Sequence, residues 1–222
     1  MKDLTKLTIN FLGDSITEGA WATEPKYNYV SQVGEKLGCK TNNYGISGTR
    51  IAIQTVPSEF PLYDLDFNKR APEMDSDADL VMVFGGTNDY GHGDSELGNL
   101  TSSDSHTFCG AVRNLATYLC KRYGKQNVCF ILPLHRYDED NPRGEFGAQT
   151  KLRPSLKDYV KAEIAVLEDM GVHYLDFRKA FPLPTTNTPT EYFQDGLHPT
   201  NKGHELLAEL IADYVRKEMS EN

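Results

Sequence analysis

The stretch Leu7-Thr8-Ile9-Asn10-Phe11-Leu12-Gly13-Asp14-Ser15-Ile16-Thr17, close to the start of the chain, contains an apolar run that ends in Gly-Asp-Ser. β-Branched and aromatic residues followed by Gly-Asp predict a strand that runs into a tight turn. Ser15 would project from the carboxyl end of that strand, the edge at which open α/β sheets bind their ligands. Ser15 is therefore a candidate nucleophile. The alternative is that Asp14 or Ser15 only caps the helix that follows.

Length and composition indicate an ordinary globular protein. The 222 residues suffice for one substantial hydrophobic core, so we expect a single domain over residues 1–222. Hydrophobic residues make up 39% of the chain and charged residues 25%, and the formal net charge is −9. This excess of acidic residues disfavours nucleic acid as a partner and gives no attraction to anionic membranes. Neutral small molecules fit this charge best as substrates, and the sequence does not indicate an oligomeric state.

Membrane and secretion signals are absent from the sequence pattern. No stretch approaches the roughly 18 apolar residues of a membrane span. Residues 1–6 lack the apolar run and the cleavage site of a secretory signal. The four cysteines (Cys39, Cys109, Cys120 and Cys129) have no C-x-x-C spacing, which indicates reduced thiols. A cytoplasmic location is therefore expected, while secretion of a processed form stays open.

Segments with strand and helix patterns alternate along the chain. The predicted strands cover residues 7–12, 39–44, 79–84, 127–134 and 172–177. The predicted helices cover residues 28–37, 105–123, 155–170 and 201–219. The proline-containing stretch 49–79 predicts short helical turns. Right-handed crossovers between such strands predict a three-layer α/β/α sandwich with a five-stranded, mainly parallel sheet in the flavodoxin-like order 2-1-3-4-5.

Residues able to carry chemistry follow several of the predicted strands. Ser15 follows the first strand, Gly48 the second and Asn88 the third, and the run Asp195-Gly196-Leu197-His198-Pro199 precedes the last helix. The carboxyl ends of parallel strands share one edge of a sheet, so these groups can converge although most of the chain separates them. Taken one at a time, each cluster is also consistent with a simple turn or a helix cap.

The residue types in these clusters suit nucleophilic catalysis. A serine hydroxyl needs a base to accept its proton, and His198 is the candidate because Asp195 can fold back to hold its Nδ1 proton. Pro199 disfavours helical backbone at His198 and lets the ring point into the site. The activity of such an enzyme is expected to fall on the acid side as His198 becomes protonated. A turn with a surface histidine is the alternative for this motif.

Ester cleavage also needs hydrogen-bond donors for the developing oxyanion. Gly48 has no Cβ, so its N–H can approach a substrate oxygen closely. Asn88 can offer a side-chain amide, and the N–H of Ser15 at a helix start would be a third donor.

The four blocks together resemble those of the GDSL/SGNH hydrolases. The blocks are Gly13-Asp14-Ser15, Gly48, Gly85-Gly86-Thr87-Asn88-Asp89 and Asp195-Gly196-Leu197-His198-Pro199. The resemblance spans residues 8–200 and implies an SGNH hydrolase domain with Ser15 as nucleophile and first oxyanion donor. It implies Gly48 and Asn88 as the other donors and Asp195 and His198 as the rest of a triad. The family covers many esters, so the substrate is not implied.

Further residues at the same sheet edge are candidates for substrate binding. They are Asp14, Arg50, His92, His135 and Arg136. A solvated loop residue is the alternative for His92. The run Asp138-Glu139-Asp140 could suggest a cation, but consecutive acids in a loop are usually solvated. Neither a metal nor another cofactor is predicted.

The sequence favours a serine esterase that removes short acyl groups, foremost O-acetyl groups, from carbohydrate-like substrates through an acyl-enzyme. The chain has no long exposed apolar run to hold a fatty tail, and its irregular loops are rich in Tyr, Asn and Arg. A lysophospholipase or thioesterase that acts on longer acyl chains is the alternative. Acyl transfer to an alcohol and a non-catalytic carbohydrate-binding module also stay open.

Overall fold

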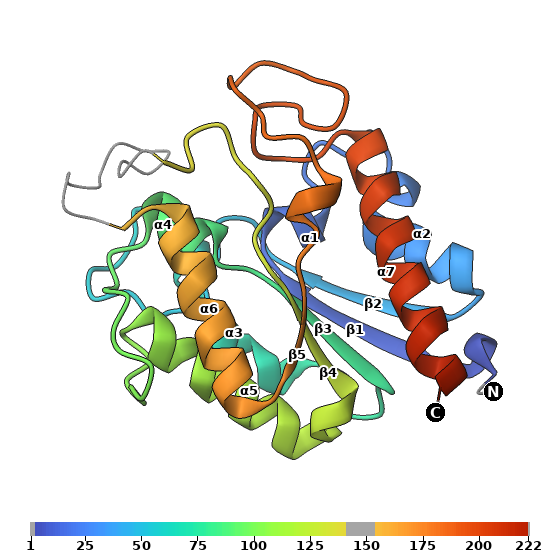
Figure 1. The fold of residues 1–222 in the computed structure, drawn as a ribbon, viewed down its shortest axis with the longest axis horizontal. Coiled ribbons are helices and arrows are strands. Elements are labelled where there is room, and N and C mark those ends of the chain that lie inside the picture. The colour runs from blue at the N-terminus through green and yellow to red at the C-terminus, as the bar shows by residue number, and fades with distance from the viewer. Residues whose placement is uncertain (1–2, 141–153, 222) are drawn as a thin grey trace.

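The computed structural model describes residues 3–140 and 154–221. Within them, five strands form a sheet in which every neighbouring pair is parallel, in the order β2-β1-β3-β4-β5 (Figure 1). The strands are β1 (Thr8–Gly13), β2 (Lys40–Gly45), β3 (Leu80–Phe84), β4 (Val128–Ile131) and β5 (His173–Leu175). The predicted strand order 2-1-3-4-5 is confirmed.

Helices cover both faces of the sheet, as the sequence predicted for a three-layer sandwich. Helix α2 (Tyr29–Leu37) packs with α7 (Asn201–Glu221) on one face, and α5 (Phe108–Tyr123) packs with α6 (Leu156–Met170) on the other (Figure 1). The short helices are α1 (Ser15–Glu18), α3 (Phe67–Arg70) and α4 (Thr87–His92). The 3-10 helices are η1 (Leu4–Lys6), η2 (Pro25–Tyr27), η3 (Pro61–Asp64), η4 (Ala71–Glu73), η5 (Lys125–Asn127) and η6 (Arg178–Ala180). None of the helices in residues 3–140 and 154–221 is both long and apolar enough to cross a bilayer.

The side chains of β3 alternate between two hydrophobic cores, because successive residues of a strand point to opposite faces. Val81 and Val83 belong to the core under α5 and α6. Leu80, Met82 and Phe84 belong to the core under α2 and α7. The continuous apolar run of this segment therefore follows from burial on both faces of the sheet.

Two strands and one helix are shorter than the sequence predicted. The predicted strands 127–134 and 172–177 reduce to β4 and β5, because their mutual ladder covers only three residue pairs. Pro133 lacks the N–H that a longer ladder would use. The predicted helix 105–123 begins at Phe108, because the Thr107 hydroxyl accepts the Gly110 N–H at 3.3 Å and caps the helix there.

The segment between β2 and β3 contains the short helices η3, α3 and η4, as predicted for residues 49–79. Arg70 of α3 forms hydrogen bonds that connect this segment to the carboxyl ends of β1 and β2. One guanidinium nitrogen donates to the Tyr44 carbonyl and the other to the Gly13 carbonyl, each at 2.9 Å. The same guanidinium donates to the Thr49 hydroxyl at 3.0 Å, so Arg70 also contacts the loop that contains Gly48.

Candidate active site

The structure places the predicted clusters at the carboxyl edge of the sheet. Ser15 opens α1 directly after β1, and Gly48 lies in the loop after β2. Asn88 lies in the first turn of α4, after β3. His198 precedes α7, yet it contacts Ser15 across 183 residues of sequence.

The turn that presents Ser15 requires glycine at the end of β1. A methyl group added to Gly13 would lie 1.9 Å from Thr17 Oγ1, so a larger residue would not fit. Asp14 accepts the Ile16 N–H at 3.0 Å and caps α1. The helix cap is therefore a real feature of the Gly-Asp-Ser motif, and the candidate nucleophile is the residue next to it.

A continuous relay of hydrogen bonds joins Ser15, His198 and Asp195. The Ser15 hydroxyl lies 2.9 Å from His198 Nε2, and His198 Nδ1 lies 2.7 Å from Asp195 Oδ2. The other Asp195 oxygen accepts the N–H groups of Leu197 at 3.1 Å and His198 at 2.8 Å. Gly196, with φ +77°, makes the turn that brings the carboxylate back to the ring. The carboxylate assigns the proton to Nδ1, so Nε2 can accept the serine proton.

The electrostatics of Asp195 keep its carboxylate ionised. Partial burial raises the pKa of Asp195, but hydrogen bonds from the His198 ring and from the backbone N–H groups of His198 and Leu197 outweigh it. The result is a pKa lowered to about 2. An ionised Asp195 can stabilise the imidazolium that forms when His198 takes up a proton.

Gly48 and Asn88 belong to one hydrogen-bonded unit. Gly48 has φ +75°, a left-handed conformation that favours glycine. The Asn88 amide donates to the carbonyl of Thr49, the next residue, at 3.0 Å. An amide nitrogen carries two hydrogens, so this bond orients the side chain and leaves a second hydrogen for another acceptor. The arrangement can present two donors to one substrate oxygen.

Glu18 of α1, the helix that begins at Ser15, contacts the Gly48 loop. Its carboxylate accepts the Ser47 N–H at 2.8 Å and also the Ser47 hydroxyl. This contact links the helix that begins at Ser15 with the residue before Gly48. No feature of the sequence distinguishes Glu18 from an ordinary helix carboxylate.

Asp89 holds the same loop from the side of α4. Its two oxygens accept the N–H groups of Ile51 at 3.0 Å and Ala52 at 2.9 Å. Burial raises the pKa of Asp89 to about 6, although these N–H groups and Arg50 oppose the rise. Its position directly after Asn88 in the Gly-Gly-Thr-Asn-Asp block was the available sequence signal.

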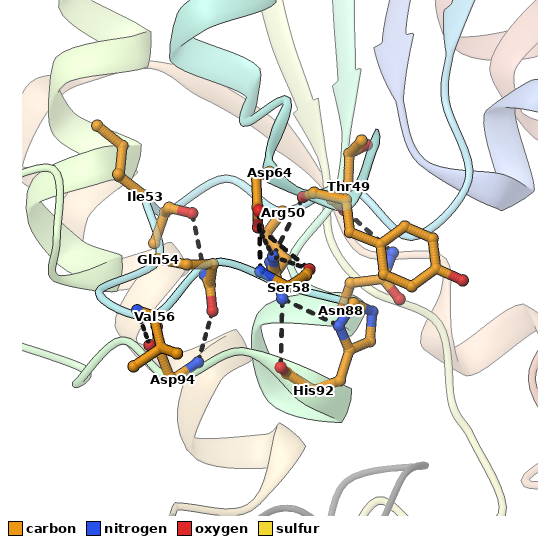
Figure 2. Close-up of polar contacts among 12 residues, drawn as sticks. Thr49, Arg50, Ile53, Gln54, Val56, Ser58, Asp64, Asn88, His92 and Asp94 are labelled. Carbon is orange, nitrogen blue, oxygen red and sulfur yellow. Dashed lines mark hydrogen bonds and ion pairs between the residues drawn. The ribbon is translucent and has the colours of Figure 1, made fainter. Parts of the chain in front are cut away.

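Arg50 supports the loop that follows Gly48. Its side chain is 3% exposed, pairs with Asp64 at 2.8 Å and donates to the Tyr63 carbonyl at 3.2 Å. Figure 2 shows the same guanidinium reaching His92, where Nη1 lies 3.1 Å from Nδ1. These partners account for the charge of Arg50 within the protein, and a substrate contact of Arg50 stays a prediction.

His92 ends α4 beside this cluster (Figure 2). Burial, with the nearby charges of Arg50 and Arg136, lowers the pKa of His92 to about 4. The ring is therefore neutral near pH 7, and because Arg50 donates to Nδ1, the proton lies on Nε2. Since the side chain is only partly buried, a substrate contact of His92 stays a prediction.

Two further candidates for substrate binding are enclosed by protein. Asp14 is 2% exposed, and burial raises its pKa to about 6 against the opposing effects of the Ile16 N–H and His198. Arg136 is fully buried, pairs with Asp138 and donates to the Thr87 carbonyl at 3.3 Å. Substrate contacts of Asp14 and Arg136 stay predictions, and both side chains support the elements on which Ser15 and Asn88 lie.

His135 lies in an ion-pair cluster. Its Nδ1 is 2.7 Å from Glu139, and Arg178 pairs with the same carboxylate at 3.2 Å. Lys157 pairs with Asp140 at 2.8 Å, so basic side chains accompany the acidic run 138–140. His135 keeps part of its surface exposed, and a substrate contact there stays a prediction.

The fold and the relay of Ser15, His198 and Asp195 are the arrangement expected of a hydrolase. Residues 11–206 match the GDSL-like Lipase/Acylhydrolase family. This match covers most of the chain, and the protein belongs to that family, whose members are esterases and lipases.

Individual relatives agree with this assignment. The chain is 27% identical to a GDSL esterase/lipase of Arabidopsis thaliana, over 95% of this chain and 86% of the relative. A solved structure of a protein from Lactobacillus plantarum is 29% identical, covers 96% of this chain and 97% of its own, and has a TM-score of 0.78. The lipase/acylhydrolase from Enterococcus faecalis is 25% identical, with coverages of 95% and 96% and a TM-score of 0.61.

The buried carboxyl group of Glu163 in α6 is expected to make the stability of the folded protein depend on pH. It is fully buried behind Gly86, and neither carboxyl oxygen forms a hydrogen bond with any residue the structure describes. Burial, and to a smaller extent Asp89, raises the pKa of Glu163 well above its ordinary value. The folded state therefore keeps this proton after the unfolded chain has lost it, so stability decreases as the pH rises above the ordinary Glu pKa.

Glu163→Gln is expected to remove this decrease. Urea unfolding at pH 5 and pH 8 should show a smaller loss of unfolding free energy in the variant than in the wild type. Glu209→Gln, at an exposed position of α7, is the control and should keep the wild-type difference. Equal losses in Glu163→Gln and the wild type would contradict the burial of an uncharged carboxyl at this position.

Proposed function

We propose that the protein is a serine esterase that hydrolyses short-chain acyl esters, foremost O-acetyl esters, of carbohydrate-like substrates. The observation that carries the proposal is the relay from Ser15 through His198 to Asp195, next to the donors at Gly48 and Asn88. This geometry supports nucleophilic acyl transfer.

In the first half of the reaction, the Ser15 oxygen attacks the ester carbonyl carbon while its proton moves to His198 Nε2. The N–H groups of Ser15 and Gly48 and the Asn88 amide stabilise the negative oxygen of the tetrahedral intermediate. The carbon–oxygen bond to the alcohol then breaks, and His198 returns the proton to the leaving alcohol. The acyl group remains on Ser15.

In the second half, water attacks the same carbonyl carbon and gives a proton to His198. The bond between Ser15 and the acyl carbon breaks, the serine oxygen regains the proton, and the carboxylic acid leaves. Asp195 remains ionised throughout, in agreement with its pKa of about 2.

The polar surroundings of the donors support a short acyl group. Arg50, Asp64, Ser58 and His92 form a connected cluster beside Asn88 (Figure 2). A long alkyl chain gains most of its binding energy from apolar walls, whereas the partly exposed side chains of this cluster, those of Ser58, Asp64 and His92, are polar. The small acetyl group has no such requirement.

An exposed aromatic residue supports a polyol as the alcohol part. Trp21 follows α1, is 55% exposed and has φ +66°. This left-handed conformation costs energy for a residue other than glycine. The indole combines a flat apolar face with an N–H donor, and these two properties suit the face and the hydroxyl groups of a sugar ring.

A longer acyl chain is the second candidate because three apolar side chains of the loop before η3 and of η3 itself are exposed. Val56, Phe60 and Leu62 are 69%, 58% and 63% exposed. Asp94 accepts the Val56 N–H at 2.7 Å and fixes this part of the loop (Figure 2). Such side chains could contact a fatty tail outside the donor site.

Hydrolysis rates across p-nitrophenyl esters from acetate to decanoate distinguish the two candidates. Short-acyl specificity predicts the highest kcat/KM for acetate or propionate and release of acetate from peracetylated mono- and oligosaccharides. A highest kcat/KM for octanoate or longer esters would instead establish the second candidate. Analysis of products with added alcohols distinguishes hydrolysis from acyl transfer.

A further inference from the structure

Tyr63 of η3 lies directly against Gly48. A methyl group added to Gly48 would lie 2.1 Å from Tyr63 Cε1 and 2.2 Å from Cδ1. The edge of the aromatic ring is therefore in van der Waals contact with the backbone of the glycine that is proposed to bind the oxyanion. Tyr63 was not among the residues that the sequence analysis predicted to contact the substrate.

The Tyr63 ring is held on its other sides as well. Its centroid lies 5.2 Å from the His92 ring, which is one helical turn after Asn88 in α4, and 5.2 Å from the Phe60 ring. Arg50 binds the Tyr63 carbonyl at 3.2 Å and the His92 carbonyl at 3.3 Å. The ring thus stays next to the elements that supply the Gly48 and Asn88 donors.

An acyl group bound at these donors must extend into space next to them. With its carbonyl oxygen at the Gly48 N–H and the Asn88 amide, the first carbons of the acyl chain lie within a few bonds of both groups. The Tyr63 ring already fills the space on Gly48, and its contact with His92 closes the side toward α4. An acetyl group needs little of this space, whereas each added methylene needs more.

We propose that the Tyr63 ring forms a wall of the acyl site and excludes long acyl chains, an inference that rests on the proposed short-acyl esterase function. Tyr63 is therefore a specificity-determining residue of the site formed by Ser15, Gly48 and Asn88. The ring, not the hydroxyl, causes the exclusion.

The test compares kcat/KM for p-nitrophenyl acetate and p-nitrophenyl octanoate in the wild type, Tyr63→Ala and Tyr63→Phe. Tyr63→Ala is expected to raise the octanoate-to-acetate ratio about ten-fold or more, because single methylenes change kcat/KM by this order in a tight pocket. Tyr63→Phe keeps the ring and should keep the wild-type ratio. Ser15→Ala measures the background hydrolysis of each ester.

Two results would overturn the inference: an unchanged ratio in Tyr63→Ala, whether or not both rates fall equally, or the same shift of the ratio in Tyr63→Phe. An equal loss would mean that the ring only supports the loop. If Tyr63→Ala does not fold, as judged by thermal unfolding, Tyr63→Leu replaces it, since leucine keeps apolar packing but shortens the wall.

The same measurements separate this inference from the proposed function. The wild-type preference between acetate and octanoate tests the short-acyl function. The change in that preference between the wild type and the Tyr63 variants tests the wall. A wild type that prefers octanoate would overturn the function, whereas an acetate-specific wild type with an unchanged Tyr63→Ala ratio would overturn only the wall.

Discussion

Replacing Ser15 by alanine is expected to lower kcat/KM for a short-chain ester about 10⁴-fold or more, because the acyl-enzyme can no longer form. The variant should fold normally, since Ser15 is a small side chain and the cap of α1 comes from Asp14. Initial rates with p-nitrophenyl acetate, together with thermal unfolding, measure both properties. The residual rate should still exceed the rate of ester hydrolysis in water, because the oxyanion donors remain in place.

Ser76→Ala is the matched control for this prediction. Ser76 is exposed, lies between η4 and β3, and hydrogen-bonds only Asp77 among the residues described. Its replacement should leave the rate unchanged. Wild-type rates in Ser15→Ala would show that the nucleophile is assigned to the wrong residue.

His198→Gln is expected to lower kcat/KM by a similar factor, about 10⁴-fold, because glutamine cannot take up the Ser15 proton. Since Ser15 and His198 act as one unit, the double variant Ser15→Ala/His198→Gln should be no slower than either single variant. His106→Gln changes an exposed histidine and should keep the wild-type rate. Additive losses in the double variant would contradict a joint action of the two residues.

The pH profile provides an independent check on the base. Wild-type kcat/KM should fall on the acid side, because a protonated His198 cannot accept the Ser15 proton. Asp195, with a pKa of about 2, stays ionised and does not cause this fall. Asp14 also takes up a proton on the acid side of neutrality, because burial raises its pKa to about 6.

Asp14→Asn separates these two contributions. Asparagine keeps the side-chain oxygen that caps α1 but does not ionise. If His198 is the base, the acid-side decrease in activity persists in this variant. A flat profile in Asp14→Asn from pH 5 to 9 would instead assign the decrease to Asp14.

The sequence was a good guide to features that depend on local pattern. Burial on both faces produces the apolar run of β3, and the Gly-Asp-Ser turn follows from the strand that precedes it. The strand order could be predicted because crossovers between parallel strands have one hand and few topologies remain. The ends of β4, β5 and α5 differed, because ladder length and capping depend on neighbouring segments.

The sequence did not show which residues the long polar side chains around the site pair with. Arg50 and Arg136 follow strands at the active edge, so a substrate contact was a reasonable hypothesis. In the structure Asp64 and Asp138 pair with them, and these partners could not be identified before the chain was folded. A long flexible side chain at a sheet edge can point inward or outward, and only tertiary packing selects between the two.

The sequence by itself determined the turn at Gly13-Asp14-Ser15 and the return of Asp195 onto His198, since each depends on residues near one another in the chain. The order of the strands was also predictable from the sequence, because crossovers of one hand leave few topologies. Tertiary structure alone decided which side chains surround the serine. Glu18, Arg50 and Tyr63 have ordinary surroundings in sequence. Glu18 meets the Gly48 loop because the neighbouring parallel strands β1 and β2 bring their carboxyl ends to one edge. Tyr63 meets Gly48 because the segment between β2 and β3 folds back on itself, where Arg50 binds the Tyr63 carbonyl. The chemistry was therefore readable from short motifs, while the shape of the acyl site depends on contacts between segments that the motifs do not contain.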